Sequence, residues 1–255
     1  MKKIKSTGII FGDMHFPLHD EKAFSCALKV IEKVKPDVFI NLGDFAEGEY
    51  VSHWRWQRRK RPPLEYQLPL IDKEADEVNY HMDRIDKALD KVGCKKKYLA
   101  MGNHDAWYNQ FVDENPYLEQ YKPEKLFKIE ERGYEWYPYG ELFKVEDSKL
   151  YAYHGGHYGS VNHARSTVQN LGCNVIYGHT HDCQRSVMQH ISGIHIAQSM
   201  GCLCKMKKDF LKGRKVNWTH NVGIVDFFTD GWFNLITLDI HNGMTTWNNK
   251  IIKGN

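Results

Sequence analysis

Short apolar runs, most of them followed at once by glycine and polar residues, recur along the first two thirds of the chain. These runs predict buried strands at residues 7–11, 38–40, 97–101, 149–153 and 174–177. Between the first two, apolar residues recur at helical spacing over 20–34, with Asp20 as the N-cap and Pro36 just beyond the end. A strand, a helix and a strand joined by short links predict a βαβ unit, and therefore parallel strands.

The segments after the second strand follow other patterns. Residues 50–67 fit no period, which predicts a loop or insertion there. Apolar residues then alternate at spacings of four and three over 71–92, which predicts a helix that Gly93 ends. We interpret its apolar stripe as a core-facing surface rather than a coiled-coil seam, because three heptads are too few to argue supercoiling.

The second half of the chain predicts mostly strands. The segment 107–139 is aromatic and mixed, with short helices expected, and a hairpin is predicted over 142–153 before a helix over 161–171. Beyond it, strands are predicted at 185–190, 193–198, 222–228, 232–240 and 243–248. Since no linker and no repeat interrupts the sequence, we expect a single domain over 1–255 with 50–67 as a loop insertion.

Composition and charge exclude several classes of protein. The 255 residues are 42% hydrophobic and 26% charged, which is ordinary for a globular chain with a sizeable core. The net charge of +3 falls short of a dedicated nucleic-acid binder. Six cysteines without a C-x-x-C pair indicate reduced thiols, and no run is long enough for a signal peptide or a membrane span. We therefore expect a cytoplasmic protein with no membrane partner; nothing in the sequence fixes its oligomeric state.

The tetrapeptide Gly102-Asn103-His104-Asp105 directly follows a predicted strand. Because Gly102 allows a sharp turn, we expect Asn103 and His104 on a loop at the strand end, where open α/β sheets place their chemistry. Alone, the tetrapeptide is also an ordinary turn. Four further short motifs rich in aspartate and histidine, in a fixed order along the chain, make a functional site the better interpretation.

Seven side chains in these motifs offer nitrogen or oxygen donors: Asp13, His15, Asp44, Asn103, His154, His179 and His181. None is a thiolate, so the set suits Mn, Fe, Zn or Ni, with Mn favoured, and does not suit a structural zinc finger. Seven protein ligands exceed what one ion needs. We therefore expect two divalent metal ions that share one carboxylate.

The same motifs resemble the signature of the calcineurin-like metallophosphoesterase family: Asp-x-His, Gly-Asp, Gly-Asn-His-Asp/Glu, His and Gly-His-x-His, over residues 12–181. The chain looks most like the compact bacterial and phage members. The resemblance implies a four-layer αββα sandwich with a dinuclear metal site at the strand ends. The ligands that it implies are Asp13, His15 and His181 for one ion, Asn103, His154 and His179 for the other, and Asp44 as the bridge.

The resemblance also implies that His104 binds no metal and lies beside the leaving oxygen or a phosphate oxygen, where an imidazole can supply a proton or a hydrogen bond. In several branches of the family an acidic residue three positions after the bridging aspartate orients this imidazole; here it is Glu47, and Asp105 is the other candidate. A plain surface acid is the alternative for Glu47. Gly48 stands where the Ser/Thr protein phosphatases have arginine, and Glu47 stands where the purple acid phosphatases have their iron-binding tyrosine.

Three functions follow from these observations. The first is a phosphoester hydrolase in which two ions clamp a phosphomonoester or phosphodiester and supply a hydroxide nucleophile near neutral pH. The second is a DNA nuclease of the same superfamily, because aromatic and basic residues alternate over 54–66 and could stack bases and contact phosphates; a solvated loop is the alternative for this stretch. The third, a non-catalytic binding protein, is disfavoured because every implied ligand and His104 are present. The aromatic and basic residues concerned are Trp54, Arg55, Trp56, Arg58, Arg59, Lys60, Arg61 and Tyr66.

Overall fold

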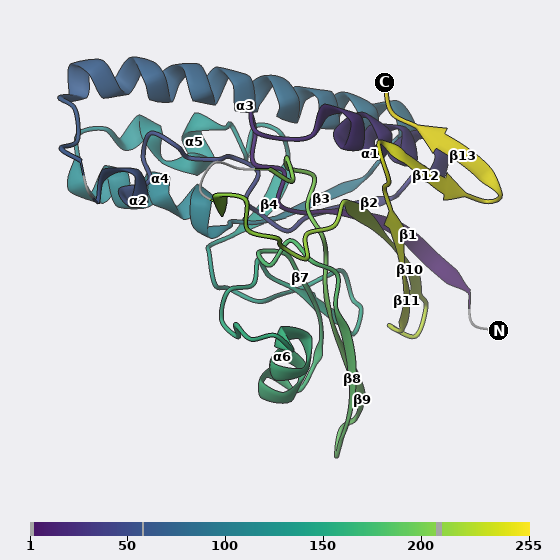
Figure 1. Ribbon diagram of the computed structural model, residues 1–255. Helices are drawn as coiled ribbons and strands as arrows, with labels where there is room; N and C mark the ends of the chain where they lie inside the picture. Colours follow the sequence, from purple (N-terminus) through teal and green to yellow (C-terminus); the bar gives the residue numbers. More distant parts are fainter. Residues whose placement is uncertain (1–2, 58, 208–210) are drawn as a thin grey trace.

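The computed structural model describes residues 3–57, 59–207 and 211–255, and two β-sheets packed face to face form its centre (Figure 1). The first sheet consists of β1 (Ile4–Phe11), β2 (Val38–Asn41), β3 (Lys96–Ala100), β4 (Tyr134–Tyr137), β10 (Asn221–Phe228) and β11 (Phe233–Asp239). Its strand order is β11-β10-β1-β2-β3-β4. The four strands β1 to β4 are parallel to one another, and β10 and β11 run antiparallel at the other edge.

The second sheet consists of β5 (Phe143–Lys144), β6 (Leu150–Ala152), β7 (Asn174–Tyr177), β8 (Arg185–His190) and β9 (Gly193–Ser199), in the order β5-β6-β7-β9-β8. A separate hairpin, β12 (Met244–Trp247) and β13 (Lys250–Lys253), packs beside the first helix. The helices are α1 (Glu21–Val34), α2 (His53–Trp56), α3 (Leu64–Val92), α4 (Asn103–Glu114), η1 (Glu119–Tyr121), α5 (Pro123–Leu126) and α6 (His163–Leu171).

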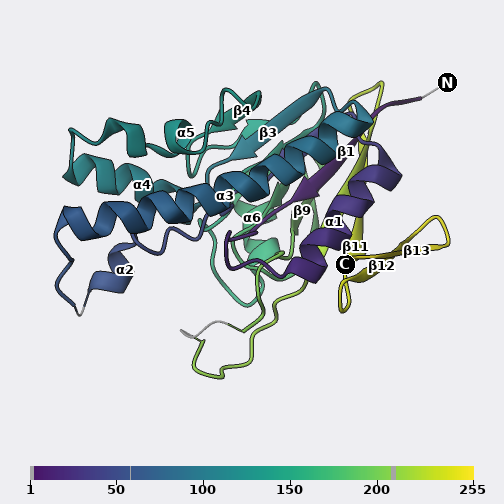
Figure 2. The same cartoon turned by 90° about the horizontal axis from the view of Figure 1, so that it is seen from above.

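Both faces of the first sheet are buried, which explains why β2 and the second half of β1 are nearly continuous apolar runs. In β1, Ile9 and Phe11 belong to the core beneath α1 and α3, and Ile10 belongs to the core between the two sheets. A third, smaller core lies between the second sheet and α6. Figure 2 shows α1 and α3 crossing over the first sheet. The four layers are therefore helices, sheet, sheet and helix, which confirms the predicted αββα sandwich.

The local predictions around the first βαβ unit are confirmed. Ile9 of β1 pairs with Phe39 of β2 in a parallel register. The side chain of Asp20 accepts a hydrogen bond from the Ala23 backbone N–H at 2.9 Å, as an N-cap does. Gly93 ends α3 with φ of +74°, a conformation that glycine adopts without strain. The apolar stripe of α3 is buried against the rest of the protein, so it faces the core.

The prediction that all of 50–67 is a loop or insertion is wrong. Residues 53–56 form α2, and α3 begins at Leu64, seven residues earlier than its apolar spacing indicated. Pro69 lies inside this first part of α3 and cannot donate a hydrogen bond to the carbonyl of Glu65. Glu65 is exposed, so water can satisfy that carbonyl.

Three further elements differ from the sequence prediction. Asn103 and His104 occupy the first turn of α4 and not a loop, because Gly102 forms the N-cap and its backbone N–H donates to the Asp105 carboxylate at 2.8 Å. The segment after α5 contributes β4 as a parallel edge strand. The chain also ends in one more strand than predicted, β13.

A buried carboxyl group on α3 supports the loop that follows β2. Glu74 is only 4% exposed and accepts hydrogen bonds from the Glu49 backbone N–H at 3.0 Å and from the Tyr108 hydroxyl at 3.2 Å. Burial, with the nearby Glu47 carboxylate, raises the pKa of Glu74 from its ordinary value of 4.5 to about 8. The side chain is therefore mostly protonated at neutral pH.

This raised pKa predicts a pH-dependent stability. Because the folded state binds the Glu74 proton more tightly than the unfolded chain, its contribution is fully present below pH 4.5 and falls as the pH rises towards 8. Urea titrations give the free energy of unfolding at each pH. Across this range it should fall by about 2–4 kcal/mol less in Glu74→Gln than in the parent protein, because the variant has no proton to lose there. The exposed Glu77→Gln is the matched control. A Glu74→Gln profile parallel to that of the parent would contradict the assignment.

Candidate metal centre

All seven predicted donors lie at the carboxyl ends of parallel strands. Asp13 and His15 follow β1, Asp44 follows β2, and Asn103 follows β3. The remaining three come from the other sheet: one histidine follows β6 and two follow β7. Because the carboxyl ends of parallel strands meet at one edge, two sheets packed face to face bring both sets of loops together. These three residues are His154, His179 and His181.

Asp44 lies at the centre of the cluster. Its Oδ2 is 3.4 Å from His154 Nε2 and 3.7 Å from His15 Nε2, so one carboxylate oxygen faces histidines from both sheets. Two groups of ligand atoms, each within 4.8 Å of one another, contain this carboxylate. The first group is Asp13, His15, Asp44 and His181, and the second is Asp44, His154 and His179.

Asn103 completes the second group. Its Oδ1 lies 2.8 Å from His179 Nδ1 and 3.2 Å from His154 Nε2. The other ring nitrogen of His154, Nδ1, donates to the Leu42 carbonyl at 2.7 Å. Since a carbonyl only accepts, this bond fixes the tautomer of His154 and turns Nε2 towards Asp44.

The backbone at these positions is strained, as is common at functional sites. Five of the seven predicted donors have φ between +48° and +70°, a region that side-chain-bearing residues rarely adopt. They are Asp13, His15, Asp44, His179 and His181. The backbone N–H of His179 donates to both Asp13 oxygens, at 3.0 and 2.9 Å. That bond ties the loop after β7 to the loop after β1.

Two glycines of the motifs are required by close approach of these carboxylates. A Cβ atom at Gly102 would overlap the Asp44 side chain and backbone, and one at Gly178 would overlap Asp13 Oδ2. Neither glycine has a positive φ. Both positions therefore require glycine because there is no room for a Cβ atom, and not because the backbone adopts a conformation that favours glycine.

The electrostatics of the cluster suit cations. Asp13 and Asp44 are 0% and 2% exposed, so water does not solvate their charges. Burial lowers the pKa of His154 and of His181, but Asp44 and Asp13 more than reverse this and raise the two values to about 9 and about 10. In the metal-free protein, protonated imidazoles thus neutralise the carboxylates. Divalent ions with neutral imidazole ligands fit the same donors.

His104 lies beside the cluster, with Nε2 4.0 Å from Asp44 Oδ2. Its Nδ1 donates to the backbone carbonyl of Glu47 at 2.6 Å, so Glu47 orients the imidazole through its main chain. The Glu47 carboxylate instead lies 3.0 Å from His15 Nδ1. Burial lowers the pKa of His104 to about 4, and a bound phosphate anion would favour the imidazolium again.

Asp105 takes a different place from the one that the sequence suggested. Its carboxylate is fully buried and accepts hydrogen bonds from the backbone N–H groups of Gly102, Asp44 and Ala46, at 2.8, 2.8 and 3.1 Å. These bonds join the loop after β2 to the start of α4. Asp105 therefore holds the backbone of Asp44 in place. The His104 ring is contacted by the backbone carbonyl of Glu47 instead.

Three residues next to the cluster carry no motif signal. The Trp107 ring lies 3.9 Å from the His104 ring, and the Trp218 ring lies 4.3 Å from the His181 ring, measured between centroids. The Cys204 sulfur is 3.8 Å from His181 Nδ1. The helical spacing of three between His104 and Trp107 could have indicated the first contact; nothing local indicates the other two.

The basic stretch over 54–66 is partly neutralised. Arg55 pairs with Glu49, and Arg61 pairs with Glu114. Arg59 and Lys60 are exposed, and Arg58 lies outside the described residues.

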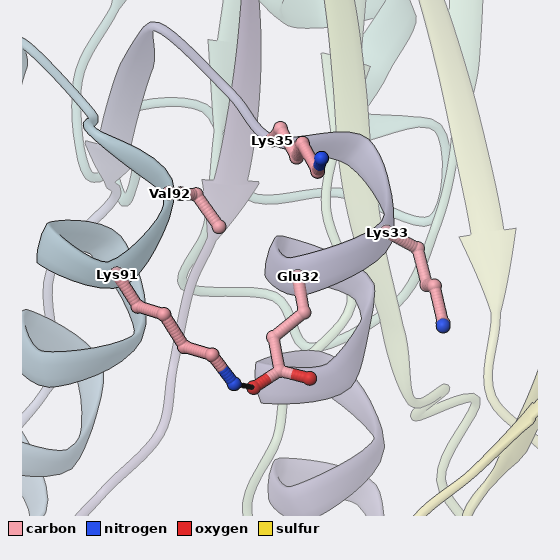
Figure 3. A pocket seen from close by; sticks show the side chains of 5 residues that line it. All are labelled: Glu32, Lys33, Lys35, Lys91 and Val92. Carbon is pink, nitrogen blue, oxygen red and sulfur yellow. Dashed lines mark hydrogen bonds and ion pairs between the residues drawn. The ribbon is translucent and has the colours of Figure 1, made fainter.

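Two pockets of the protein lie at different places relative to the cluster. A pocket of about 370 Å³ lies where α1 and α3 end, opposite the strand ends that carry the cluster (Figure 3). In this pocket, Lys91 donates a hydrogen bond to the Glu32 carboxylate at 2.7 Å, so part of the charge in the pocket is already paired. A second pocket, of about 320 Å³, is lined in part by Trp218, whose ring packs on the His181 ring. None of the described helices is long and apolar enough to cross a membrane.

Comparison with known proteins agrees with the motif resemblance. The sequence model described as calcineurin-like phosphoesterase matches residues 9–183, more than half of the chain. The gene 54 protein of Mycobacterium phage D29 is 24% identical over 236 residues, which cover 85% of this chain and 87% of that protein. Among solved structures, the E. coli phosphoesterase YfcE aligns with a TM-score of 0.44 at 15% identity, over 90% of this chain and 98% of its own. Chaetomium thermophilum Vps29 aligns with a TM-score of 0.47 at 9% identity, over 97% and 96%.

The close approach at Gly178 can be tested directly. Gly178→Ala should displace the Asp13 carboxylate, which lowers the free energy of unfolding by about 1–3 kcal/mol and weakens uptake of divalent metal. Thermal unfolding and metal analysis of the purified protein measure both effects. Gly159→Ala is the matched control, since a Cβ there meets no atom within 4 Å. Equal stability and metal uptake in the two variants would contradict the geometry.

Proposed function

The chain belongs to the calcineurin-like phosphoesterase family, and we propose that it hydrolyses phosphomonoesters or phosphodiesters at a pair of divalent metal ions. Family membership supports metal-dependent phosphoester hydrolysis in general terms. The observation that carries the two-ion proposal is the position of Asp44, whose carboxylate belongs to both groups of ligand atoms. A carboxylate shared in this way is how two-metal hydrolytic sites hold their ions close together.

In this proposal the ligands divide as the two groups do. Asp13, His15 and His181 would hold one ion, Asn103, His154 and His179 would hold the other, and Asp44 would be shared between them. When bound, two divalent ions polarise the phosphoryl group and make hydroxide available near neutral pH. Manganese remains the favoured metal on the basis of the donor set.

The remaining chemistry falls to residues of the chain itself. The Glu47 carbonyl fixes the ring of His104 through Nδ1, which leaves Nε2 on the side of Asp44. When a bound phosphate anion favours the imidazolium form of His104, Nε2 also carries a proton, and we assign it the task of giving that proton or a hydrogen bond to the leaving oxygen. Asp105 holds the backbone of Asp44 and so acts as a positioning residue.

The direct test is a panel of small aryl phosphates, as monoesters and diesters, assayed with Mn, Fe, Zn and Ni after removal of bound metal. Hydrolysis that depends on added metal supports the proposal. A protein that retains its fold but hydrolyses neither class of ester with any of these metals would refute it.

Metal content should separate the two ligand groups. Because Asp44 belongs to both, Asp44→Ala should reduce occupancy at both positions, whereas His179→Ala should lower it by about one ion per chain. Elemental analysis at saturating metal gives the stoichiometry, with the exposed His241→Ala as the control. One ion per chain at saturation, with full activity, would contradict the bridged pair.

His104→Ala should separate chemistry from metal binding. Removing a proton donor lowers the rate by about 10²- to 10⁴-fold while metal content stays unchanged, since no proposed ligand is lost. The loss should be largest for alkyl esters and smallest for nitrophenyl esters, whose leaving group needs no proton. If metal and activity fall in proportion instead, His104 is a ligand and its assigned role is wrong.

A further inference from the structure

Three imidazoles of the site form a row of contacting rings. The His15 ring lies 4.5 Å from the His104 ring and 5.0 Å from the His181 ring, in both cases edge to face. His15 and His181 belong to the first group of ligand atoms, and His104 is the proposed proton donor. The row therefore passes along the place where the scissile phosphate would lie.

A tryptophan closes each end of this row. Trp107 packs on His104 with ring centroids 3.9 Å apart and an interplanar angle of 37°. Trp218 packs on His181 with centroids 4.3 Å apart and an angle of 59°. Both tryptophans are only partly buried, so each carries aromatic surface from the site to the exterior. Trp107 also packs against the core beneath α1 and α3, whereas Trp218 belongs to none of the three described cores.

The two tryptophans have different surroundings. At the Trp107 end, the ring centroid of His53 lies 6.3 Å from that of Trp107. The ring centroid of Trp54, which is 61% exposed, lies 4.5 Å from that of His53. At the other end, Trp218 forms part of the wall of the 320 Å³ pocket, together with His220 and Asp239. Figure 2 shows α2, which carries His53 and Trp54, well separated from the connection between β9 and β10 that carries Trp218.

Exposed basic side chains occur on the segments at both ends of the row of rings. Arg59 and Lys60 are exposed beyond α2. The connection between β9 and β10 exposes a larger set of basic side chains: Lys205, Lys207, Lys212, Arg214 and Lys215. Exposed basic residues around aromatic side chains are typical of surfaces that follow a single nucleic-acid strand, where the charges contact phosphates and the rings stack on bases.

We propose that the site takes a phosphodiester with an aromatic base on each side, as in a single nucleic-acid strand, and that Trp107 and Trp218 are its two stacking platforms. This inference rests on the proposed function and narrows its substrate class. A phosphomonoester carries one organic group and would engage only one of the two platforms. A duplex hides its bases in the stack, so its bases cannot contact the two indole rings unless the duplex is opened.

Binding can be measured without turnover, with fluorescein-labelled oligothymidylate and protein kept metal-free by EDTA. Trp107→Leu and Trp218→Leu should each weaken binding at least about fivefold, since one base–aromatic stack is lost. Trp107→Phe and Trp218→Phe should restore most of the affinity because a ring remains. The control is Trp232→Leu, a 40% exposed tryptophan in the turn between β10 and β11, at the other end of β1. A duplex of the same length should bind more weakly than the single strand.

Turnover distinguishes the two stacking platforms. With metal, thymidylyl-thymidine should be hydrolysed with a lower KM than either methyl phosphodiester of thymidine, which has one base. Each leucine variant should remove the preference for the base on one side. Leucine variants that bind the strand as the parent does, or a parent that binds duplex equally well or does not prefer the dinucleotide, would overturn this inference. If no small phosphoester is hydrolysed with any metal, the proposed function itself fails.

Discussion

The candidate metal centre depends on one constraint: two carboxylates, Asp13 and Asp44, lie where water does not reach. A buried charge is costly unless it is paired and hydrogen-bonded. Backbone N–H groups and imidazoles meet that requirement here. The His104 N–H donates to Asp44 and the His179 N–H donates to Asp13. Each bond joins loops that are distant in sequence, so satisfying the carboxylates also fixes the loops.

The elements predicted well are those with a local cause. The apolar runs of β1 and β2, the Asp20 cap and the Gly93 terminus each depend on a few neighbouring residues, and the structure has all of them. The resemblance of the motifs gave the four layers. The early start of α3 was missed because residues 50–67 fit no period, so nothing in that stretch indicated that the helix begins at Leu64, directly after Pro63.

The parts of the site that could not be predicted depend on contacts between distant segments. A backbone carbonyl has no sequence signature, so the bond from His104 to the Glu47 main chain could not be distinguished from a bond to the Glu47 side chain. The contact of Trp218 with His181 joins residues that only the fold brings together. By contrast, the gathering of the seven predicted donors in one place could be expected, because most of their motifs follow an apolar run and the carboxyl ends of parallel strands share one edge.

The division of the donors between two sheets has a thermodynamic consequence. A cation that takes ligands from both sheets binds only while their packed faces are in register, so it favours the assembled sandwich over any state in which the sheets separate. Each tenfold excess of such an ion over its dissociation constant adds about 1.4 kcal/mol to the free energy needed to separate the two sheets. The availability of such an ion would then set the equilibrium stability of the fold.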